Sequence, residues 1–282
     1  MNKSPKRIFV AYADAKMSYS LMRIGRQARA LDIFDEVILY TPDDLPDKIR
    51  QLKLMQFSYG GGYWAWKPWI IYDTLQKNEE GTIVCYVDAG CTLRKGIEWS
   101  LYFDLMNDYQ TLCFKYKDFM SEWEKFGTSC TKIKYWSKKS LLLFLDKYTN
   151  SDSYRETNKI WGGALFFKGK NNPFLSQWMD ITFNYPEVIL DPSEEELSDQ
   201  YPFFVLHKHD QVVLTALASY NMESCMILPE LSETHGECVA IYASRIRAKS
   251  KYEYILEMAK RKMRKLLGPI VYDLFKKSLK KL

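Results

Sequence analysis

Two aspartates stand directly after apolar segments that are typical of buried strands. Asp14 ends the segment RIFVAYAD, and Asp88 ends GTIVCYVD. Ala89 and Gly90 follow Asp88 and have almost no side chain, which leaves room for a ligand to approach the backbone. A carboxylate in this setting can hold a hard cation or a ribose hydroxyl. The alternative is that Asp88 only caps the turn that follows it.

A lysine lies inside the most unusual stretch of the chain, YGGGYWAWKPW. Three consecutive glycines are followed there by three tryptophans, Lys67 and Pro68. Proline is favourable at the first turn of a helix, because its missing N–H would have no partner there. Lys67 and the free N–H groups at that helix start could therefore bind phosphate oxygens. An isolated lysine is usually a solvated surface group, but this setting favours a site, with Trp66 as a candidate floor for a sugar.

A third group of polar residues, HKHDQVV, opens a predicted helix. Asp210 and Gln211 fall in its first turn, and a carboxylate there can accept a proton from an attacking hydroxyl. His207 and His209 are two residues apart, so they share a face of an extended segment. We expect His209 to be a second ligand of the cation that Asp88 would hold. The alternative is that both histidines are ordinary surface groups.

Two glycines interrupt a strand-like segment, WGGALFFK. Gly162 and Gly163 follow Trp161 in this segment. Glycine inside a strand indicates a bulge or the close approach of another group to the backbone. We therefore expect these three residues, with Trp66 and Gln211, to line a ligand pocket, which the resemblance given below implies is an acceptor or sugar pocket.

Strands and helices alternate along the chain, which predicts an α/β protein with a mixed, mostly parallel sheet flanked by helices. In such sheets ligands bind beyond the carboxyl ends of the strands, where Asp14 and Asp88 would lie. The expected strands are 7–14, 35–41, 81–88, 111–116 and 161–168, and the expected helices are 20–31, 43–55, 68–77, 137–148, 173–185 and 209–220. Residues 191–202 are predicted to form an acidic connection.

The composition limits the class of protein. The 282 residues have an ordinary apolar fraction of 47%, and the six cysteines are scattered without a C-x-x-C pair. This spacing argues against a zinc knuckle and against a disulfide scaffold, so we expect a reducing, cytoplasmic setting. The start of the chain lacks the features of a signal peptide. No apolar run approaches the roughly 20 residues that span a bilayer.

The net charge of +5 is unevenly distributed. Residues 245–282 carry 13 Lys/Arg and 3 Asp/Glu, a net of +10, whereas residues 1–244 have a net of −5. We therefore divide the chain into a catalytic domain, 1–244, and a basic amphipathic helical tail, 245–282. The tail predicts peripheral binding to an anionic membrane surface, on the inner face of the cell membrane. It lacks the interleaved aromatics of single-strand binders, so we expect no nucleic acid partner. The alternative is a helix packed on the domain.

Taken together, these segments resemble bacterial glycosyltransferases of the GT-A type, which build capsular and O-antigen polysaccharides. The resemblance extends over most of residues 7–245 and lies in AYAD, RIGRQA, GGGYWAWKPWII, GTIVCYVDAGC, WGGALFFK and HDQVVL, in that order. It implies a GT-A fold and a nucleotide-sugar donor, in the first place a uridine diphosphate sugar. With the basic tail, it also implies a glycan or lipid-linked glycan as acceptor.

The resemblance further implies roles for individual residues. Asp88 occupies the first position of the D-x-D motif, and Lys67 would reach the donor sugar or its phosphates. Asp210 would be the general base of an inverting reaction, or would position the sugar in a retaining one. Arg245 would close over the diphosphate. Three residues would border the base and ribose of the donor: Tyr12, Ala13 and Asp14.

One departure from the D-x-D pattern bears on the cofactor. The third position, which is usually a ligand of Mn²⁺ or Mg²⁺, is Gly90. Either the divalent cation is held by Asp88, a histidine and the diphosphate, or Lys67 and Arg245 balance the phosphate charge without a metal. We favour the cation, which makes Asp88 and His209 its expected ligands.

Two other classes of protein are weighed against this interpretation. Another Rossmann-like nucleotide-dependent enzyme would need a glycine-rich turn after the first strand, but that turn, ADAKMSYS, has no glycine. A non-catalytic sugar-binding protein could keep the same fold. Hydrolysis of uridine diphosphate sugars would separate the enzyme from both alternatives.

Overall fold

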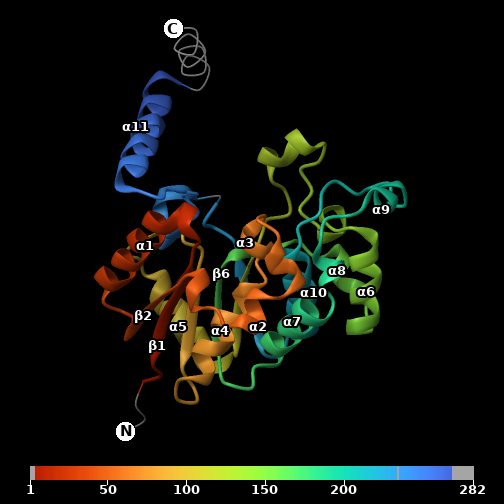
Figure 1. Cartoon of the computed structure of the whole chain (residues 1–282), viewed down its shortest axis with the longest axis horizontal. Coiled ribbons are helices and arrows are strands. Elements are labelled where there is room, and N and C mark those ends of the chain that lie inside the picture. The colour runs from red at the N-terminus through yellow and green to blue at the C-terminus, as the bar shows by residue number, and fades with distance from the viewer. Residues whose placement is uncertain (1–3, 234, 269–282) are drawn as a thin grey trace.

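The computed structural model describes residues 4–233 and 235–268, and its centre is a six-stranded sheet (Figure 1). The strand order is β2-β1-β3-β6-β5-β7. The strand β6 is antiparallel to both of its neighbours, whereas all other pairs are parallel. The mixed, mostly parallel α/β sheet predicted from the sequence is therefore confirmed. The strands are β1 (Arg7–Tyr12), β2 (Glu36–Tyr40), β3 (Ile83–Val87), β5 (Thr111–Lys115), β6 (Ile160–Lys168) and β7 (Cys225–Pro229).

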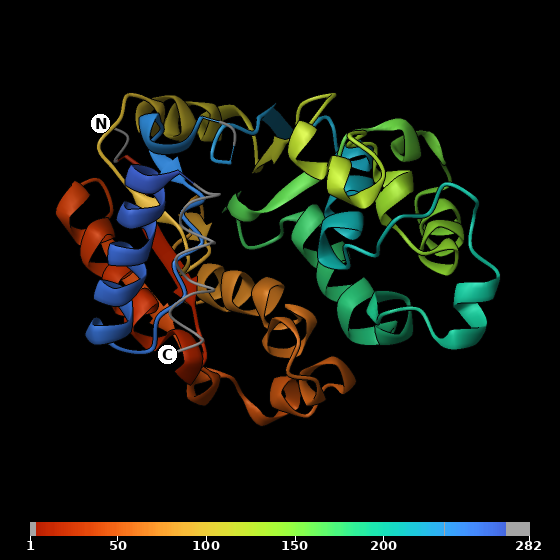
Figure 2. The ribbon, with the colours of Figure 1, turned by 90° about the horizontal axis from the view of Figure 1, so that it is seen from above.

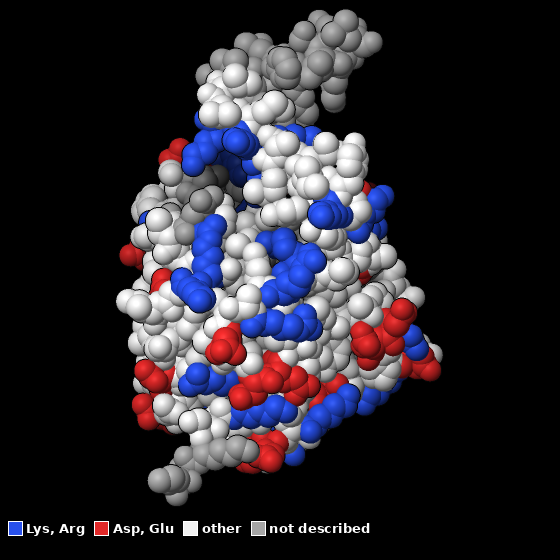
Figure 3. Space-filling model, turned by 90° about the vertical axis from the view of Figure 1, so that its left-hand side faces the viewer, with Lys and Arg blue, Asp and Glu red and all other residues white. Residues whose placement is uncertain are grey.

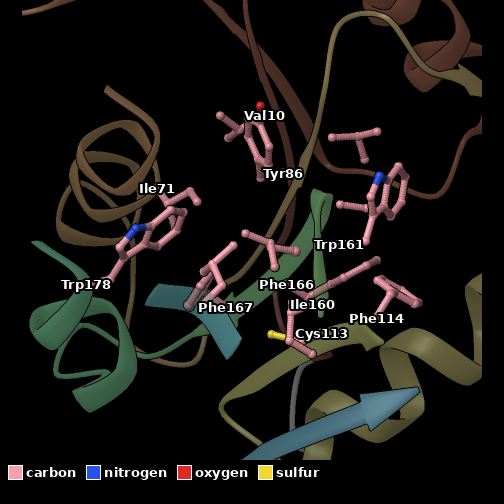
Figure 4. Packing of buried hydrophobic residues seen from close by; sticks show 14 of the residues in the cluster. Val10, Ile71, Tyr86, Cys113, Phe114, Ile160, Trp161, Phe166, Phe167 and Trp178 are labelled. Atoms are coloured by element: carbon pink, nitrogen blue, oxygen red, sulfur yellow. The ribbon is translucent and has the colours of Figure 1, made fainter. Parts of the chain in front are cut away.

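Helices cover both faces of the sheet, as Figure 2 shows from above. Adjacent side chains of β6 point to opposite faces: Phe166 contacts Phe103 of α5, whereas Phe167 contacts Trp178 of α7 (Figure 4). Burying a phenylalanine in this way stabilises the fold by about 2 kcal/mol. The principal helices are α1 (Ser18–Leu31), α4 (Trp66–Gln76), α5 (Glu98–Asp108), α6 (Lys139–Thr149), α7 (Pro173–Asn184) and α10 (Asp210–Tyr220).

The helix predicted over 43–55 is wrong. The segment forms a 3-10 turn at Pro42–Asp44, the single turn α2 (Asp47–Arg50) and a second 3-10 turn at Lys53–Gln56. Pro46 and Leu52 have ψ values of 157° and 143°, which are incompatible with a continuing helix. The predicted connection 191–202 also contains a short helix, α9 (Glu194–Ser198), because Ser193 and Glu196 form a capping box at its start. A further single turn, α8, spans Pro186–Ile189.

The three consecutive glycines form a left-handed turn, α3 (Gly60–Tyr63). Five consecutive residues, from Gly60 to Trp64, have positive φ values. The left-handed conformation costs roughly 1–2 kcal/mol for each residue with a side chain but little for glycine. Gly62 is also required sterically, because a Cβ atom there would lie 2.5 Å from Met55 Sδ. This turn delivers the chain directly into α4.

The last part of the described chain begins with a second, two-stranded sheet, in which β4 (Thr92–Leu93) pairs with β8 (Ile241–Tyr242). The backbone then returns to the body of the protein, where Ile246 N–H donates to Gly90 O at 2.9 Å and Ser20 Oγ donates to Ile246 O at 2.9 Å. The helix α11 (Lys251–Leu267) follows beside α1. Residues 269–282 of the predicted tail lie outside the described residues.

The helix α11 turns its apolar stripe away from the domain. Its contacts with the body include Tyr254, whose ring lies 5.5 Å from that of Tyr19, and Arg261, which donates to Ser244 O. The predicted stripe is exposed within residues 4–233 and 235–268: Tyr252, Ile255, Leu256, Ala259, Met263, Leu266 and Leu267. In that part of the chain, no helix is long and apolar enough to span a membrane.

Candidate functional site

Four segments of the sequence meet at the edge of the sheet where the parallel strands end. Because β6 runs antiparallel, its beginning lies at this same edge, and Asp88 N–H donates to Gly163 O at 2.9 Å. The pairing of Val10 with Tyr86 places the end of β1 beside the end of β3. The helix α10 begins against β6, since a Cβ atom on Gly162 would lie 3.3 Å from Asp210 Oδ2 at the first position of the helix. The edge that sequence analysis assigned to ligand binding is therefore built from distant parts of the chain.

Lys67 is the centre of this arrangement. Its side chain is only 2% exposed, and its Nζ donates to Asp210 Oδ2 at 3.1 Å and to Gly162 O at 3.0 Å. Asp88 Oδ1 lies 3.8 Å from the same nitrogen. Burial alone would lower the pKa of Lys67, but the carboxylates of Asp210 and Asp88 outweigh it and raise the pKa above its ordinary value. The lysine is therefore a permanent counter-ion within this cluster.

The two carboxylates differ in their exposure. Asp210 is 9% exposed and lies at the first position of α10, whereas the Asp88 side chain is 42% exposed. The Tyr86 hydroxyl donates to Asp88 Oδ1, which fixes the orientation of the carboxylate and leaves Oδ2 free of that bond. Lys67, Asp88 and Asp210 together carry a net charge of −1. The cluster is therefore suited to a developing positive charge.

The turn that follows Asp88 is held by a buried arginine from α1. Arg23 donates to Thr92 Oγ1 at 2.8 Å and to the carbonyl oxygens of Cys91 and Ala89. Arg23 lies in the RIGRQA segment, to which sequence reasoning gave no role. One guanidinium group donates to several oxygen atoms of the turn at once, because its N–H groups form a rigid fork. These hydrogen bonds hold Ala89 and Gly90 in one conformation.

Glycine at position 162 allows the ion cluster to sit directly on β6. A Cβ atom there would lie 3.3 Å from Asp210 Oδ2 and 3.5 Å from Lys67 Nζ. Gln211 also lies against this position, with Cγ at 3.5 Å from that Cβ. Its amide oxygen is buried and has no hydrogen-bond partner in the described part of the chain. Such an orphaned acceptor is suited to a ligand hydroxyl.

The end of β1 contributes an aromatic stack. The rings of Tyr12 and Trp66 lie 3.9 Å apart at an interplanar angle of 21°, and Trp66 Nε1 donates to Gly60 O at 3.2 Å. Trp66 and Tyr12 are both buried, at 5% and 6% exposed. Neither ring is therefore open to a sugar or a base, contrary to what we expected from the sequence. Ala13 is buried next to Tyr12, and Asp14 accepts a hydrogen bond from Lys16 N–H in the following turn.

Trp161 is likewise part of the interior. It is buried, and its ring packs over Gly163, where a Cβ atom would lie only 2.3 Å from the indole. The close approach that we expected at the two glycines is therefore made by two different groups. Trp161 approaches Gly163, and the ion cluster approaches Gly162. Two parts of the predicted sugar pocket lie beside the ion cluster, namely the backbone of β6 at Gly162 and the side chain of Gln211.

The predicted pair of metal ligands, Asp88 and His209, is not assembled. Nδ1 of His209 lies 2.9 Å from Ile189 O, and its Nε2 faces Asp191 Oδ1 at 3.5 Å. Both ring nitrogens therefore have other partners. Burial lowers the pKa of His209, so the ring is neutral at physiological pH. No group of three or more metal-ligating side chains occurs within residues 4–233 and 235–268. The protein residues at Asp88 and Gly90 thus do not fit a divalent cation held by the chain.

Arg245 lies on the other side of the same turn. Its Cα is 3.7 Å from the position of a Cβ on Gly90. Its guanidinium, which is 68% exposed, pairs with Glu233 at 2.8 Å. Arg245 has a φ of 51°, and backbone strain of this kind costs about 1–3 kcal/mol and concentrates at functional sites.

The distribution of strained residues supports the location of the site. Six non-glycine residues of the described chain have positive φ. Asp32 and Asn150 simply end the helices α1 and α6. The other four border the site: Tyr63, Trp64, His209 and Arg245.

Comparisons with known proteins add similarity of fold. No protein-family model matches the chain, and no curated protein matches it significantly. A glycosyltransferase involved in the glycosylation of the major capsid of PBCV-1 is similar over 90% of this chain and 100% of its own, with 8% identity and a TM-score of 0.46. Mouse xyloside xylosyltransferase 1 is similar over 79% of this chain and 84% of its own, with 11% identity and a TM-score of 0.39. The galactosyltransferase LgtC is similar over 78% of this chain and 72% of its own, with 13% identity and a TM-score of 0.35. Likenesses this distant carry no argument about the activity of this chain.

Proposed function

We propose that this protein is a glycosyltransferase that moves a sugar from a nucleoside diphosphate donor, in the first place a uridine diphosphate sugar, to a hydroxyl of a glycan acceptor. The observation that carries the proposal is the meeting of Lys67, Asp88 and Asp210 within one buried ion cluster. These residues come from three separate motifs of the GT-A resemblance, and Lys67 and Asp210 are 143 residues apart in the sequence. The cluster lies at the edge of the sheet where α/β enzymes bind their ligands.

The charge of the cluster suits the reacting sugar. Glycosyl transfer develops positive charge at the anomeric carbon, and preorganised negative charge stabilises it. The net charge of −1 on Lys67, Asp88 and Asp210 is held in place by the Lys67 hydrogen bonds. Gln211 Oε1, which lacks a partner in the described chain, would accept a hydrogen bond from a sugar hydroxyl.

Asp210 is our candidate for the group that acts on the acceptor. In an inverting reaction, its free oxygen would take the proton of the attacking hydroxyl. In a retaining reaction, it would position the donor sugar. The anomeric configuration of the product, read from the proton coupling constant, distinguishes the two roles.

The experiment that tests this function measures release of uridine diphosphate from a panel of uridine diphosphate sugars. We expect hydrolysis or transfer with at least one donor, and a loss of about 10²–10⁴-fold in rate for Asp210→Asn if the aspartate is a base. Asp199→Asn is the matched control, because Asp199 is an exposed acid that pairs with Lys139. Full activity of Asp210→Asn would remove the base role, and no turnover or binding of any nucleoside diphosphate sugar would refute the function.

We further propose that the acceptor is a lipid-linked surface polysaccharide and that the protein works in the cytoplasm, at the inner face of the membrane. The support is α11, whose apolar stripe is exposed in the described structure, while Lys and Arg, together with Glu253 and Glu257, occupy most of the rest of its surface. Figure 3 shows Lys and Arg over the upper and middle part of this side of the molecule, toward the tail, with most acidic residues below. Each basic residue near an anionic surface contributes about 1 kcal/mol. Figure 1 places α11 at the same end of the molecule as the edge that carries the site.

Vesicle binding tests the membrane proposal. We expect the full chain to sediment with vesicles that contain phosphatidylglycerol, and to be released by raised salt. Deletion of 251–282 should abolish binding while the hydrolysis of a soluble donor persists. Equal binding to neutral vesicles, or binding that survives the deletion, would contradict it.

A further inference from the structure

A second buried lysine lies at the same edge of the sheet, and the mechanism above does not use it. Lys159 immediately precedes β6 and is 1% exposed. Its Nζ lies 3.5 Å from the ring centroid of Trp123, 4.5 Å from that of Trp136 and 4.8 Å from that of Tyr116. The ammonium is therefore enclosed by three aromatic faces.

The charge of Lys159 is not balanced by a direct partner. Within residues 4–233 and 235–268, its Nζ makes no ion pair within 4.0 Å and no hydrogen bond, unlike the buried Lys67 and Lys138, which have both. Cation–π contacts offset only part of the free-energy cost of burying a charge. Burial lowers the pKa of Lys159 well below its usual value, and the nearby Lys208 lowers it further. An anion would therefore find a site here whose charge is still unpaired.

Two more cations extend this cluster toward the active edge. Lys208 lies against the same indole as Lys159, with Nζ at 5.9 Å from the Trp136 centroid, and it immediately precedes the strained His209. Arg245 closes the cluster on the other side, where its backbone touches Gly90. Glu233, which pairs with Arg245, is the carboxylate that faces all three positive groups.

The group of cations around Lys159 and the ion cluster around Lys67 are therefore complementary in charge. The ion cluster at Lys67 has a net charge of −1, whereas Lys159, Lys208, Arg245 and Glu233 have a net charge of +2 when both lysines are protonated. A polar ligand that carries a positive centre at one end and an oxyanion at the other would match both. An activated sugar has these two ends in its transition state.

We propose that Lys159, Lys208 and Arg245 form the subsite for the donor's diphosphate and supply the positive charge that a divalent cation would otherwise provide. This inference rests on the proposed function. In the transfer step, the bond between the anomeric carbon and the diphosphate oxygen breaks, and its electron pair stays on the diphosphate. The acceptor oxygen forms the new bond to the anomeric carbon. The acceptor proton passes to Asp210 in an inverting reaction, or to the departing phosphate oxygen in a retaining one.

Access to Lys159 is controlled by the segment that carries Trp123. This residue lies in the 3-10 turn Ser121–Phe126, and Figure 1 shows the yellow-green part of the chain around it standing out beyond the sheet. Trp123 is the most exposed of the three rings, at 9%, compared with 4% for Tyr116 and 0% for Trp136. On this proposal, a shift of that indole would open the route by which the diphosphate reaches the ammonium. Binding of the diphosphate would then raise the pKa of Lys159, so the protein takes up a proton.

Calorimetric titration with uridine diphosphate in EDTA tests the subsite. We expect binding without metal, about tenfold weaker for Lys208→Met and for Lys159→Met, because a hydrogen bond to a charged group contributes about 1.5 kcal/mol. Titrations at pH 8.5 in buffers of different ionisation enthalpy should show proton uptake in the wild type that Lys159→Met loses, which a purely structural lysine would not cause. Lys77→Met is the control, since Lys77 is an exposed lysine that pairs with Asp73.

The outcomes separate the two proposals. Binding that requires Mn²⁺, or wild-type affinity in both lysine variants, would overturn the diphosphate subsite and leave the glycosyltransferase function standing. No binding of any nucleoside diphosphate, with or without Mn²⁺, would overturn the function itself. Lys159→Met replaces a buried charge by an apolar side chain of similar length, so we expect it to fold, and Lys208→Met provides an independent test at a less buried position.

Discussion

Replacing Lys67 with methionine tests whether the buried ion cluster holds the site together. The substitution removes an ammonium that lies 3.1 Å from Asp210 and 3.8 Å from Asp88. Asp210 is 9% exposed and would lose its counter-ion in a buried environment, whereas Asp88 is 42% exposed and stays hydrated. Removing one partner of a buried ion pair costs about 3–5 kcal/mol. We therefore expect Lys67→Met to lower the free energy of unfolding by about that amount.

The double variant isolates the interaction between the two buried partners. In Lys67→Met/Asp210→Asn, no buried charge is left unpaired, because Asp88 remains in contact with water. We expect the double variant to be more stable than Lys67→Met alone, with a coupling energy of about 1–3 kcal/mol. The coupling is measured by urea unfolding of the four proteins, followed by tryptophan fluorescence.

A second buried lysine serves as the control for this measurement. Lys138 is also 2% exposed, but its Nζ donates to Glu187 O at 2.8 Å and pairs with Glu196, neither of which belongs to the ion cluster of Lys67. Lys138→Met should therefore destabilise the fold without changing nucleotide affinity. A cost below about 1 kcal/mol for Lys67→Met, together with no coupling to Asp210, would refute the assignment of a buried ion cluster.

Three further changes test other parts of the site. Gly61 has a φ of 61°, and a Cβ atom there would make only ordinary contacts, at 3.5 Å from Trp66 Nε1 and 3.9 Å from the Tyr12 ring. Gly61→Ala should therefore lower the free energy of unfolding by about 1–2 kcal/mol, from the backbone conformation alone, and weaken uridine diphosphate binding. Gly81→Ala, at φ 85° and far from the site, should affect stability alone in urea unfolding. Gln211→Met removes an unpaired buried oxygen, so unfolding should show about 1 kcal/mol of added stability while steady-state kinetics show a KM about tenfold higher. Burial lowers the pKa of His207 well below its ordinary value of 6.5. The contribution of His207 to the free energy of unfolding should therefore be constant above pH 6.5. As the pH falls below 6.5, this contribution should decrease by up to about 1.4 kcal/mol per pH unit. Urea titrations at each pH measure this slope, which His207→Gln should reduce.

The regular elements were predictable from the sequence because their signals are local. The apolar runs that became β1, β3 and β6 were each recognised, and so was α10, from a segment with an N-terminal aspartate. The helix α5 and the edge strand β7 were missed. The strand β7 ends in Pro229 and is short, and such a segment has no alternation from which a strand can be inferred.

The site was predictable in its members but not in its contacts. Sequence reasoning identified Lys67, Asp88 and Asp210. The spacing of these residues could not show that the lysine lies between the two carboxylates, because that depends on the antiparallel position of β6 in the sheet. Tyr86 could have been found, since it lies two residues before Asp88 and therefore on the same face of β3. Lys159 had no such signal, because its aromatic neighbours come from three separate loops and strands.

The left-handed turn marks another limit of local reasoning. Three glycines indicate that positive φ is permitted, but they do not show that Tyr63 and Trp64 will continue in the same conformation. That continuation is imposed by packing, including the hydrogen bond of Tyr63 to Asp191 at 2.7 Å. The strain is therefore visible only in the folded chain.

The segment between β8 and α11 determines how far the chain can be truncated from its C-terminal side without loosening the site. Ser244 Oγ and Ile246 N–H both bond to Gly90 O, and Ala248 N–H bonds to the Ser20 hydroxyl. A protein that stops just before α11 keeps these hydrogen bonds, so the turn at Asp88, Ala89 and Gly90 keeps its conformation. One that stops seven residues earlier frees that turn, and its loss of turnover would be mistaken for a catalytic need for the amphipathic helix.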